Sequence, residues 1–414
     1  MSIPSRFIAG LLLPAITIAL LNYSQDPFLL LLPSSHFHIA YDKLNRMKHA
    51  FGISKIRPDF LIIGSSRVRT IPRMHPALTN MPLYIANLSG GRMIEIVQYF
   101  HFAQKIHPLK QAVIGLHVES FVSRRISADF DPDRISDNPW IRKTAMVKDL
   151  FFLLYSKETT ASSLALLKNK LLHLQPAATS TANDFLSLNY CNAGRPSALQ
   201  PPPLDPHIAQ ALQLSLQDFR SILDEARQHH TDLRLFITPF HASRYEMPIG
   251  DQANDADTYW KRALVEMIAQ EAADHHSDPF PLWDFSGYNT INTEAFLSCA
   301  IYNDSSHINS KGSSMILDRI FHTCPTPCTL PQDFGVLLTS ENIDEHLKEL
   351  EKRRMEYHRQ NPETVASWNQ LIRRRCAELA KPLPTTPPPS AGSPSHSETA
   401  DAIPPVSGAR LPGS

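Results

Sequence analysis

Two short motifs hold the residue types that acyl transfer through a serine requires. The first is the Gly-Ser-Ser-Arg segment of residues 64–67, directly after an apolar run at 60–63. The second is the Asp-Ser-Ser-His segment of residues 304–307. A serine hydroxyl becomes a nucleophile when a base removes its proton, and histidine is such a base near neutral pH when a carboxylate fixes its tautomer. Together the motifs predict a Ser-His-Asp triad.

The setting of each motif favours this chemistry. Asp304 and His307 are three residues apart, so a turn brings both side chains to one side. A serine that follows a strand lies where a helix can begin, and backbone N–H groups there point at developing negative charge. Gly90 or Gly91, after a second predicted strand, adds another N–H because glycine permits close approach by a substrate. Such donors would form an oxyanion hole.

Each motif also has an ordinary structural explanation. Gly-Ser-Ser after a strand is a common turn or helix cap, and Asp-x-x-His is a frequent tetrapeptide. The alternative is a globular α/β protein in which both motifs are coincidental turns. The nucleophile elbow of α/β-hydrolases is disfavoured, because it requires glycine two residues after the serine and Val68 stands there.

The elements that must position these motifs alternate between short apolar runs and longer stretches with helical spacing. The runs at 60–63, 83–88, 112–116 and 233–239 predict strands, and the stretches at 94–106, 208–229 and 260–273 predict helices. This alternation predicts an α/β fold, a three-layer flavodoxin-like parallel sheet with helices on both faces. Polar residues at the carboxyl ends of the strands suit a site at that edge.

The remaining segments predict the domain organisation. We expect a membrane anchor at 1–33, a connector at 34–57, an α/β domain at 58–335, a charged helical region at 336–381 and a disordered Pro/Ser-rich tail at 382–414. Residues 120–205 do not follow the strand–helix alternation. We interpret them as a helical insertion that caps the site.

The N-terminus has the pattern of a membrane signal. Residues 7–21 are apolar and follow Arg6, and residues 22–24 could complete a transmembrane helix at the interface, since a span needs roughly 20 residues. A cleaved signal peptide is the alternative, but no small-x-small site follows Leu21. The positive-inside rule places the N-terminus of a single-pass anchor in the cytoplasm and the domain outside, in the periplasm.

Composition narrows the class of partner. The 414 residues include 40 Lys plus Arg and 40 Asp plus Glu, so no basic excess predicts nucleic acid as a partner. The 5 cysteines are scattered, but Cys324 and Cys328 could close a small local loop in an oxidising compartment. No phosphate-cradling glycine loop or metal-ligand cluster is visible, so we expect neither a cofactor nor a metal.

Residues 63–66, 87–91 and 304–307, in this order, resemble blocks I, II and V of the SGNH (GDSL-like) hydrolase superfamily. With the segments 115–121 and 281–289, the layout resembles a membrane-anchored bacterial branch of that superfamily. Its members include alginate O-acetylation proteins and the D-alanyl-lipoteichoic acid protein D. The resemblance covers roughly residues 58–320.

The resemblance implies a role for each motif residue. Block I reads Gly-Asp-Ser in the family, which makes Ser66 the nucleophile, with His307 as base and Asp304 as its orienter. The oxyanion hole would consist of Ser66, Gly90 and His117, where His117 stands in the position of the block III asparagine. A histidine there could donate a hydrogen bond, but its protonation would make activity pH-sensitive. Arg67 and His241 are expected to line the substrate cleft.

The expected function is a membrane-anchored esterase or O-acyltransferase on a cell-envelope glycan or lipid. The alternative is a catalytically silent binding or assembly protein of the same fold, which would present an envelope polymer to a membrane-bound acyltransferase. The missing block III asparagine and the large insertion motivate this second hypothesis.

Overall fold

The computed structural model describes residues 3–28, 30–31, 44–172, 206–246, 253–295, 298, 300–326 and 328–379. The predicted tail at 382–414 lies outside these residues. So do residues 34–43 of the predicted connector and residues 173–205 of the predicted insertion.

The described chain is an α/β fold with a mostly parallel six-stranded sheet, in the order β2-β1-β3-β4-β5-β8. The strands are β1 (Phe60–Ser65), β2 (Leu83–Leu88), β3 (Gln111–Leu116), β4 (Asp232–Ile237), β5 (Leu282–Asp284) and β8 (Val336–Leu338). Strands β1 to β5 pair in parallel, and β8 pairs antiparallel with β5. The four predicted strands are confirmed. β5 and β8 were not predicted, because three-residue strands carry too little periodicity to be recognised.

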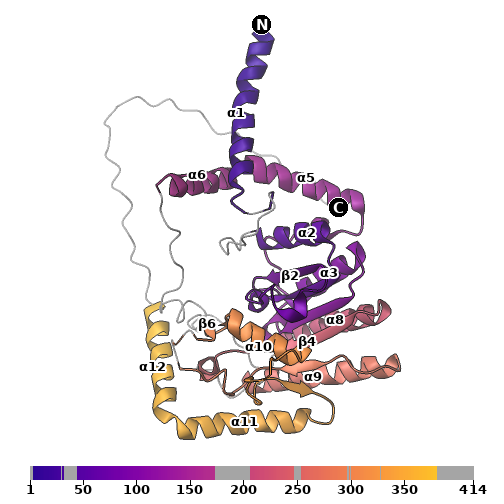
Figure 1. The fold of residues 1–414 in the computed structure, drawn as a ribbon, viewed down its shortest axis with the longest axis vertical. Coiled ribbons are helices and arrows are strands. Elements are labelled where there is room, and N and C mark those ends of the chain that lie inside the picture. Colours follow the sequence, from indigo (N-terminus) through magenta and orange to yellow (C-terminus); the bar gives the residue numbers. More distant parts are fainter. Residues whose placement is uncertain are drawn as a thin grey trace, which may run out of the picture.

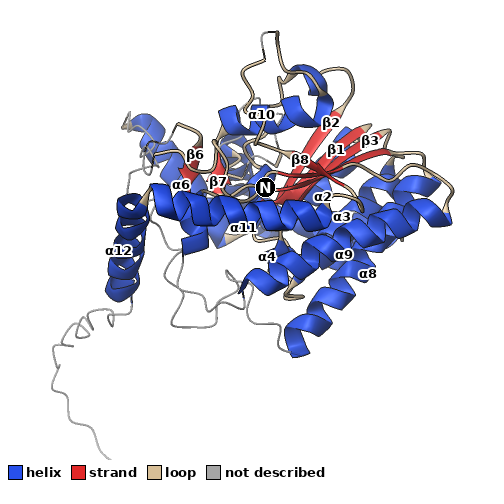
Figure 2. Cartoon of the chain, turned by 90° about the horizontal axis from the view of Figure 1, so that it is seen from below, coloured by secondary structure: helices blue, strands red, loops and turns tan. Residues whose placement is uncertain are grey.

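Alternate residues of β1 enter two different cores, which explains its unbroken apolar sequence. Leu61 and Ile63 belong to one core, together with side chains of α3 (Met93–Ile106), α8 (Pro206–Gln228) and α9 (Ala253–Asp274). Phe60 and Ile62 belong to the second, with side chains of α10 (Ser310–Phe321). Figure 2 shows α10 on one side of the sheet and α8 and α9 on the other. All six residues of β1 are buried.

The predicted charged region forms two helices, α11 (Ile343–Gln360) and α12 (Pro362–Leu379). Trp368 of α12 is fully buried, stacks on Tyr357 of α11 at 5.6 Å and lies edge-on to His241 at 5.4 Å. α12 also packs on the short helix η6 (Ala242–Glu246). This helical pair therefore covers part of its own α/β domain.

The predicted helical cap is not formed by the described part of the insertion. Helices α5 (Pro139–Tyr155) and α6 (Lys157–Leu171) pack on each other and on α1 (Ile3–Gln25), and α5 also packs on η4 (Pro132–Ile135). Figure 1 shows them beyond α2 (Asn45–Ile56) and the β2 edge of the sheet. The sequence shows that these helices are amphipathic, but the surface that each apolar face meets is decided by tertiary packing.

Of the helices in the described part of the chain, none is long and apolar enough to cross a membrane. The prediction of a transmembrane helix counted on Asn22 at a membrane interface. Asn22 is instead buried by protein, where its Nδ2 donates to the Leu154 carbonyl at 2.8 Å and to Thr160 Oγ1 at 3.0 Å. The apolar run at 7–21 alone is shorter than the roughly 20 residues that a span needs.

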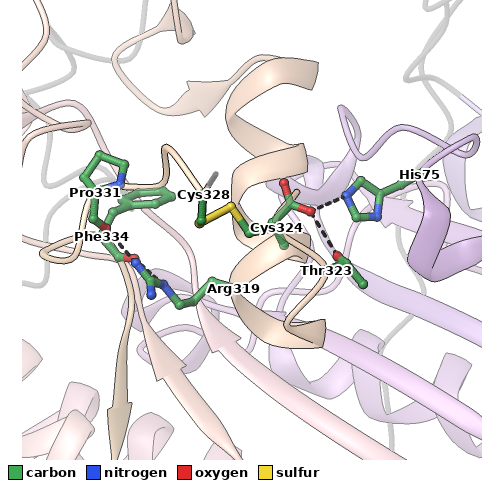
Figure 3. The surroundings of a disulfide bond; sticks show 8 residues. His75, Arg319, Thr323, Cys324, Cys328, Pro331 and Phe334 are labelled. Carbon is green, nitrogen blue, oxygen red and sulfur yellow. Dashed lines mark hydrogen bonds and ion pairs between the residues drawn. A yellow bond between two sulfur atoms is a disulfide. The ribbon is translucent and has the colours of Figure 1, made fainter. Parts of the chain in front are cut away.

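A disulfide joins Cys324 and Cys328 just after α10, a pairing that their spacing allowed (Figure 3). On one side, Arg319 donates to the carbonyls of Phe334 and Pro331 at 3.0 and 2.6 Å. On the other side, Thr323 Oγ1 donates to an Asp318 carboxylate that also pairs with His75 at 3.2 Å. The loop is thus held between α10 and the segment that leads to β8.

Candidate active site

The structure brings together the three residues that the motifs predicted for the triad. Ser66 Oγ lies 2.8 Å from His307 Nε2, and His307 Nδ1 lies 2.7 Å from Asp304 Oδ2. The carboxylate can only accept, so the Nδ1–H of His307 donates to it and Nε2 is free to accept from the serine hydroxyl. The side chains of His307 and Asp304 are about a quarter exposed, at 24% and 25%. Solvent therefore reaches the candidate site.

Two short elements position these side chains. Ser66 begins η2 (Ser66–Val68), a 3-10 turn directly after β1, so the strand ends one residue before the candidate nucleophile. Asp304 ends β6 (Tyr302–Asp304) and His307 begins β7 (His307–Ile308) of a two-stranded antiparallel hairpin. The base and its orienter thus come from one tight turn, which lies against η2 through β7.

Asp304 also holds this turn together. Its Oδ1 accepts from the backbone N–H of Ser306 at 2.7 Å and from that of His307 at 2.9 Å, while Oδ2 binds the imidazole. Burial acts to raise the pKa of Asp304, but the hydrogen bond and charge of His307 and these two N–H groups outweigh it and lower the pKa. The carboxylate therefore stays ionised near neutral pH and can stabilise an imidazolium on His307.

Gly64 allows the strands beneath the site to approach closely. A Cβ there would lie 2.9 Å from the carbonyl oxygen of Gly115 on β3 and 2.9 Å from Val68 Cγ1. Gly64 and Gly115 are register partners. Only a residue without a side chain fits between β1, β3 and η2, and this contact fixes where Ser66 leaves the strand.

Gly90, a predicted oxyanion donor, lies in the turn after β2 with a φ of 60°, a conformation that favours glycine. A Cβ at Gly90 would meet no heavy atom within 4 Å, so its backbone borders open space. The turn is closed by Gly91, whose N–H donates to the Leu88 carbonyl at 2.8 Å. Of the two glycines that the sequence suggested, Gly90 is therefore the one whose N–H the turn does not use.

His117, the third predicted oxyanion residue, is buried directly after β3. Its Nδ1 lies 2.9 Å from Glu119 Oε2, and its Nε2 has no hydrogen-bond partner in the described part of the chain. Burial, and next the charge of Arg67, lower the pKa of His117 to about 4. The ring is neutral at pH 7 with its proton on Nδ1, so Nε2 carries a lone pair. In this state Nε2 can accept a hydrogen bond but cannot donate one to an oxyanion.

Glu119 is the centre of a buried charge cluster that the sequence did not reveal. Its carboxylate pairs with Arg67 at 3.2 Å and with Arg244 at 3.0 Å, besides its bond to His117. Burial acts to raise the pKa of Glu119, but the charge of Arg67 and then the bond from His117 outweigh it, so the pKa is well below its usual range. Glu119 comes shortly after β3, as Ser66 comes after β1, and that position was the one signal in the sequence.

Arg67, a predicted substrate-binding residue, belongs to this cluster. Its guanidinium binds both oxygens of Glu119, at 3.2 and 3.3 Å, and lies 3.8 Å above the ring of Phe240. Arg244 reaches the same ring at 4.7 Å, and its Nη1 donates to Ser306 Oγ at 2.8 Å. The cluster therefore links the residue after Ser66 to the turn that holds Asp304 and His307.

His241, the other predicted substrate-binding residue, is fully buried beneath the Asp304 turn. Its Nδ1 lies 2.7 Å from Ser243 Oγ and its Nε2 lies 3.1 Å from the carbonyl of Glu294. Its backbone N–H donates to the Ser305 carbonyl at 3.1 Å. Both ring nitrogens are engaged within the protein, so this geometry supports the turn and offers no atom to a substrate.

One group of side chains in the described chain has the spacing of a metal site: Asp224, Glu271 and His275, between α8 and α9. The two carboxylates of this group already form ion pairs with arginines. Arg227 pairs with Glu271 at 2.8 Å, and Arg220 pairs with Asp224 at 2.7 Å. The arginine charges balance the two carboxylates, so an ion-pair network between α8 and α9 that includes the buried Glu271 accounts for this group.

Neither a scan against protein-family models nor a search of curated proteins finds a match for this chain.

Proposed function

We propose that this protein is a serine esterase or O-acyltransferase of the SGNH type that acts on an ester of a cell-envelope glycan or lipid. One observation carries the proposal: His307 is hydrogen-bonded to both Ser66 and Asp304. The distance from Ser66 Oγ to His307 Nε2 is 2.8 Å, and that from His307 Nδ1 to Asp304 Oδ2 is 2.7 Å. A nucleophile bound to a base, with that base bound to a carboxylate, is the arrangement that activates a serine.

The proposed reaction has two halves. Ser66 Oγ attacks the ester carbonyl while its proton moves to His307 Nε2, and Asp304 stabilises the imidazolium. The tetrahedral intermediate collapses, the leaving alkoxide takes the proton from His307, and an acyl-Ser66 ester remains. Water or a sugar hydroxyl then gives its proton to His307 and attacks this ester. The second tetrahedral intermediate collapses with cleavage of the bond between the acyl carbon and Ser66 Oγ, and Ser66 Oγ takes the proton back from His307. The choice between these two acceptors distinguishes hydrolysis from transfer.

Charge on the carbonyl oxygen must be stabilised during both halves. The proposed donors are the backbone N–H groups of Ser66 and Gly90. The open space beside Gly90 supports this assignment, because a substrate oxygen must approach the donor directly. His117 is a poor donor in its neutral form, so the two backbone groups would carry this role.

The strand order supports the assignment to the superfamily. The order β2-β1-β3-β4-β5 is that of flavodoxin-like folds, in which ligands bind outside the carboxyl ends of the strands. Ser66 follows the carboxyl end of β1, and His117 follows that of β3. The motifs resembling SGNH blocks I, II and V are thus consistent with the topology on which the family is built.

The proposal includes a location. We infer that the protein is attached to the bacterial cytoplasmic membrane and that its α/β domain faces the periplasm. The Cys324–Cys328 disulfide supports an oxidising compartment, because such bonds are rare in the cytosol. An envelope polysaccharide or lipid, and a membrane-bound acyltransferase as partner, fit that location.

A second candidate function is a catalytically silent protein that binds an envelope polymer for a separate acyltransferase. The observation that favours it is the state of His117. The position where the resemblance expects an asparagine donor holds a neutral imidazole whose free nitrogen accepts hydrogen bonds. An oxyanion hole with fewer donors would slow catalysis by roughly 10²- to 10³-fold for each donor lost.

A serine-directed fluorophosphonate probe separates the two functions. We expect the full chain to be labelled at Ser66, and Ser66→Ala to abolish labelling and acetyl-ester hydrolysis. Ser65→Ala is the matched control, since the Ser65 hydroxyl only accepts a 3.4 Å bond from the Arg67 N–H. Absence of labelling in the folded wild-type chain would exclude the catalytic proposal and favour the silent protein.

A further inference from the structure

Large apolar side chains line the outer face of α5. Trp140, Val147 and Phe151 are 77%, 54% and 61% exposed. Their spacing along the helix places all three on one side. Tyr155 extends this row and stacks on Phe151 with ring centroids 5.9 Å apart. We call this row the outer face of α5.

The opposite side of α5 is attached to the protein, which fixes the direction of the outer face. Ala145 and Leu153 are buried there. Between them, Asp149 accepts two hydrogen bonds from the Arg134 guanidinium, at 2.7 and 2.9 Å. Rotation of the helix would break this part-buried pair, so the outer face is held away from the domain.

The charges around the outer face are mostly basic. The basic residues of α5 and α6 are Arg142, Lys143, Lys148, Lys157, Lys168 and Lys170, and the acidic residues are Asp149 and Glu158. Asp149 is neutralised by Arg134, which leaves Glu158 as the one unbalanced acid of these two described helices. Lys143 Nζ lies 5.4 Å from the ring of Trp140. Aromatic side chains flanked by lysines are typical of helices that lie on anionic lipid.

Helix α1 extends this surface. It rises from the α5–α6 pair on the side away from α2 and the sheet (Figure 1). Leu12, Leu13 and Leu20 are 54%, 69% and 62% exposed, and Leu13 and Leu20, seven residues apart, lie on one side of the helix. The buried Asn22 ties the base of α1 to both α5 and α6. Leu164 of α6 is also 52% exposed, so exposed apolar side chains of three helices lie at one end of the molecule (Figure 1).

We propose that the outer face of α5, the exposed side of α6 and the apolar part of α1 together dock onto an anionic lipid surface. α5 would lie along the headgroups with Trp140 and Phe151 in the acyl boundary, and α1 would enter the lipid beside it. A protein partner is disfavoured, because the buried centres of protein interfaces are depleted in lysine. Lysines at the edge of an apolar face instead match lipid phosphates.

This docking sets the orientation of the candidate site. Beyond α5, the molecule continues through η4 and α2 to the edge strand β2, and the sheet then extends away to β8. The strands run across the line from β2 to β8. Their carboxyl ends, which Ser66 and His117 follow, therefore point along the lipid surface and not toward it. A substrate attached to the same membrane would meet the site laterally.

Fluorescence of Trp140 tests the proposal directly. Of the 4 tryptophans, Trp260 and Trp368 are fully buried and Trp283 is partly buried. The full chain is mixed with vesicles of phosphatidylcholine and phosphatidylglycerol that carry brominated acyl chains. We expect quenching of the emission, and Trp140→Phe should remove most of the quenching without preventing binding. Ser66→Ala should behave as wild type, so failure of docking and failure of catalysis are distinguishable.

Substitutions on the outer face test its contribution to affinity. Val147→Ser combined with Phe151→Ser should weaken partitioning into these vesicles by at least about tenfold. Lys143→Glu combined with Lys148→Glu should weaken it by about tenfold, and pure phosphatidylcholine should remove that difference. Met355→Ser, an exposed apolar residue of α11 at the other end of the molecule, is the control and should change nothing.

Three outcomes would overturn the proposal. The first is no binding of the full chain to anionic vesicles. The second is binding without quenching of Trp140, which would mean that α1 alone enters lipid and the outer face points away. The third is protection of Trp140 from acrylamide in the absence of vesicles together with a larger particle in light scattering, which would assign the face to a second copy of the chain.

Discussion

The imidazole of His117 and the carboxylate of Glu119 meet in a buried hydrogen bond of 2.9 Å between Nδ1 and Oε2. This bond decides which ring nitrogen of His117 carries the proton, because an ionised carboxylate can only accept. The free Nε2 is then an acceptor at the position where the resemblance to SGNH hydrolases expects a donor. The same carboxylate binds the arginine that follows the candidate nucleophile, so one acid links the oxyanion position to Ser66.

His117→Asn should increase the rate of ester hydrolysis. The amide side chain places an N–H donor near the carbonyl oxygen, where the neutral imidazole has a lone pair. We expect kcat for an acetyl ester to rise roughly tenfold at pH 7. This is less than the roughly 10²- to 10³-fold change in kcat that one well-placed oxyanion donor contributes. Steady-state kinetics with a chromogenic acetate measure it. A lower kcat with unchanged stability would show that His117 assists the reaction as an acceptor.

Asp304→Asn should abolish activity with little loss of stability. The amide keeps an acceptor oxygen for the N–H groups of Ser306 and His307, but it cannot stabilise the His307 imidazolium. We expect kcat to fall by about 10⁴-fold while KM changes little. Urea unfolding of the same variant is the control. An active Asp304→Asn variant would remove Asp304 from the triad.

Gly64→Ala should misplace Ser66. The added Cβ would lie 2.9 Å from both the Gly115 carbonyl and Val68 Cγ1, so β1, β3 or η2 must shift. A shift of the nucleophile by about 1 Å costs about 10²-fold in rate, and overpacking costs about 1–3 kcal/mol of stability. The rate of fluorophosphonate labelling and the urea midpoint measure the two effects. Labelling at the wild-type rate would show that this contact does not position the serine.

Glu119→Gln should destabilise the fold, because it leaves the buried Arg67 and Arg244 without a counter-ion. Breaking a buried pair from one side costs about 3–5 kcal/mol, which denaturant unfolding measures. Labelling of Ser66 should also slow, since Arg67 is the next residue. Glu158→Gln on α6, an exposed acid, is the matched control and should change stability by less than about 0.5 kcal/mol. Equal stability of the two variants would contradict a structural role for the cluster.

The free energy of unfolding should decrease as the pH is lowered through the mildly acidic range. Burial lowers the pKa of His49 to about 3 and those of His117 and His241 to about 4, from 6.5. Between pH 6.5 and 4 the unfolded chain therefore binds more protons than the folded chain, and the free energy of unfolding decreases as pH drops through this window. Each group contributes up to about 1.4 kcal/mol per pH unit. Urea unfolding across the window measures the slope.

His241→Gln tests how much His241 contributes to the change of the free energy of unfolding with pH. It removes one buried titrating ring, so the loss of stability per pH unit should be smaller than in the wild type, whatever its effect on stability at pH 7. A wild-type stability that stays constant or increases as the pH is lowered from 6.5 to 4 would contradict the buried neutral state of these histidines.

The local parts of this protein were predictable from its sequence. The continuous apolar run of β1 predicts a strand covered on both faces, because each alternate side chain needs a core. The three-residue spacing of Asp304 and His307 predicts that they share a turn, and the spacing of Cys324 and Cys328 predicts a local loop. Each prediction depends on residues that are close along the chain, where backbone geometry limits the possible arrangements.

Tertiary structure alone decided the rest. Arg67, Glu119 and Arg244 come from three separate segments, and nothing local to any of them indicates that their charges meet in one buried cluster. The same holds for α5, whose sequence contains apolar and charged residues but does not say which surface of the protein each side of the helix meets. The sequence determined the four longer strands of the sheet and which residues follow them. Long-range packing determined which arginines meet Glu119 and which side of α5 remains exposed, because both depend on contacts between distant segments.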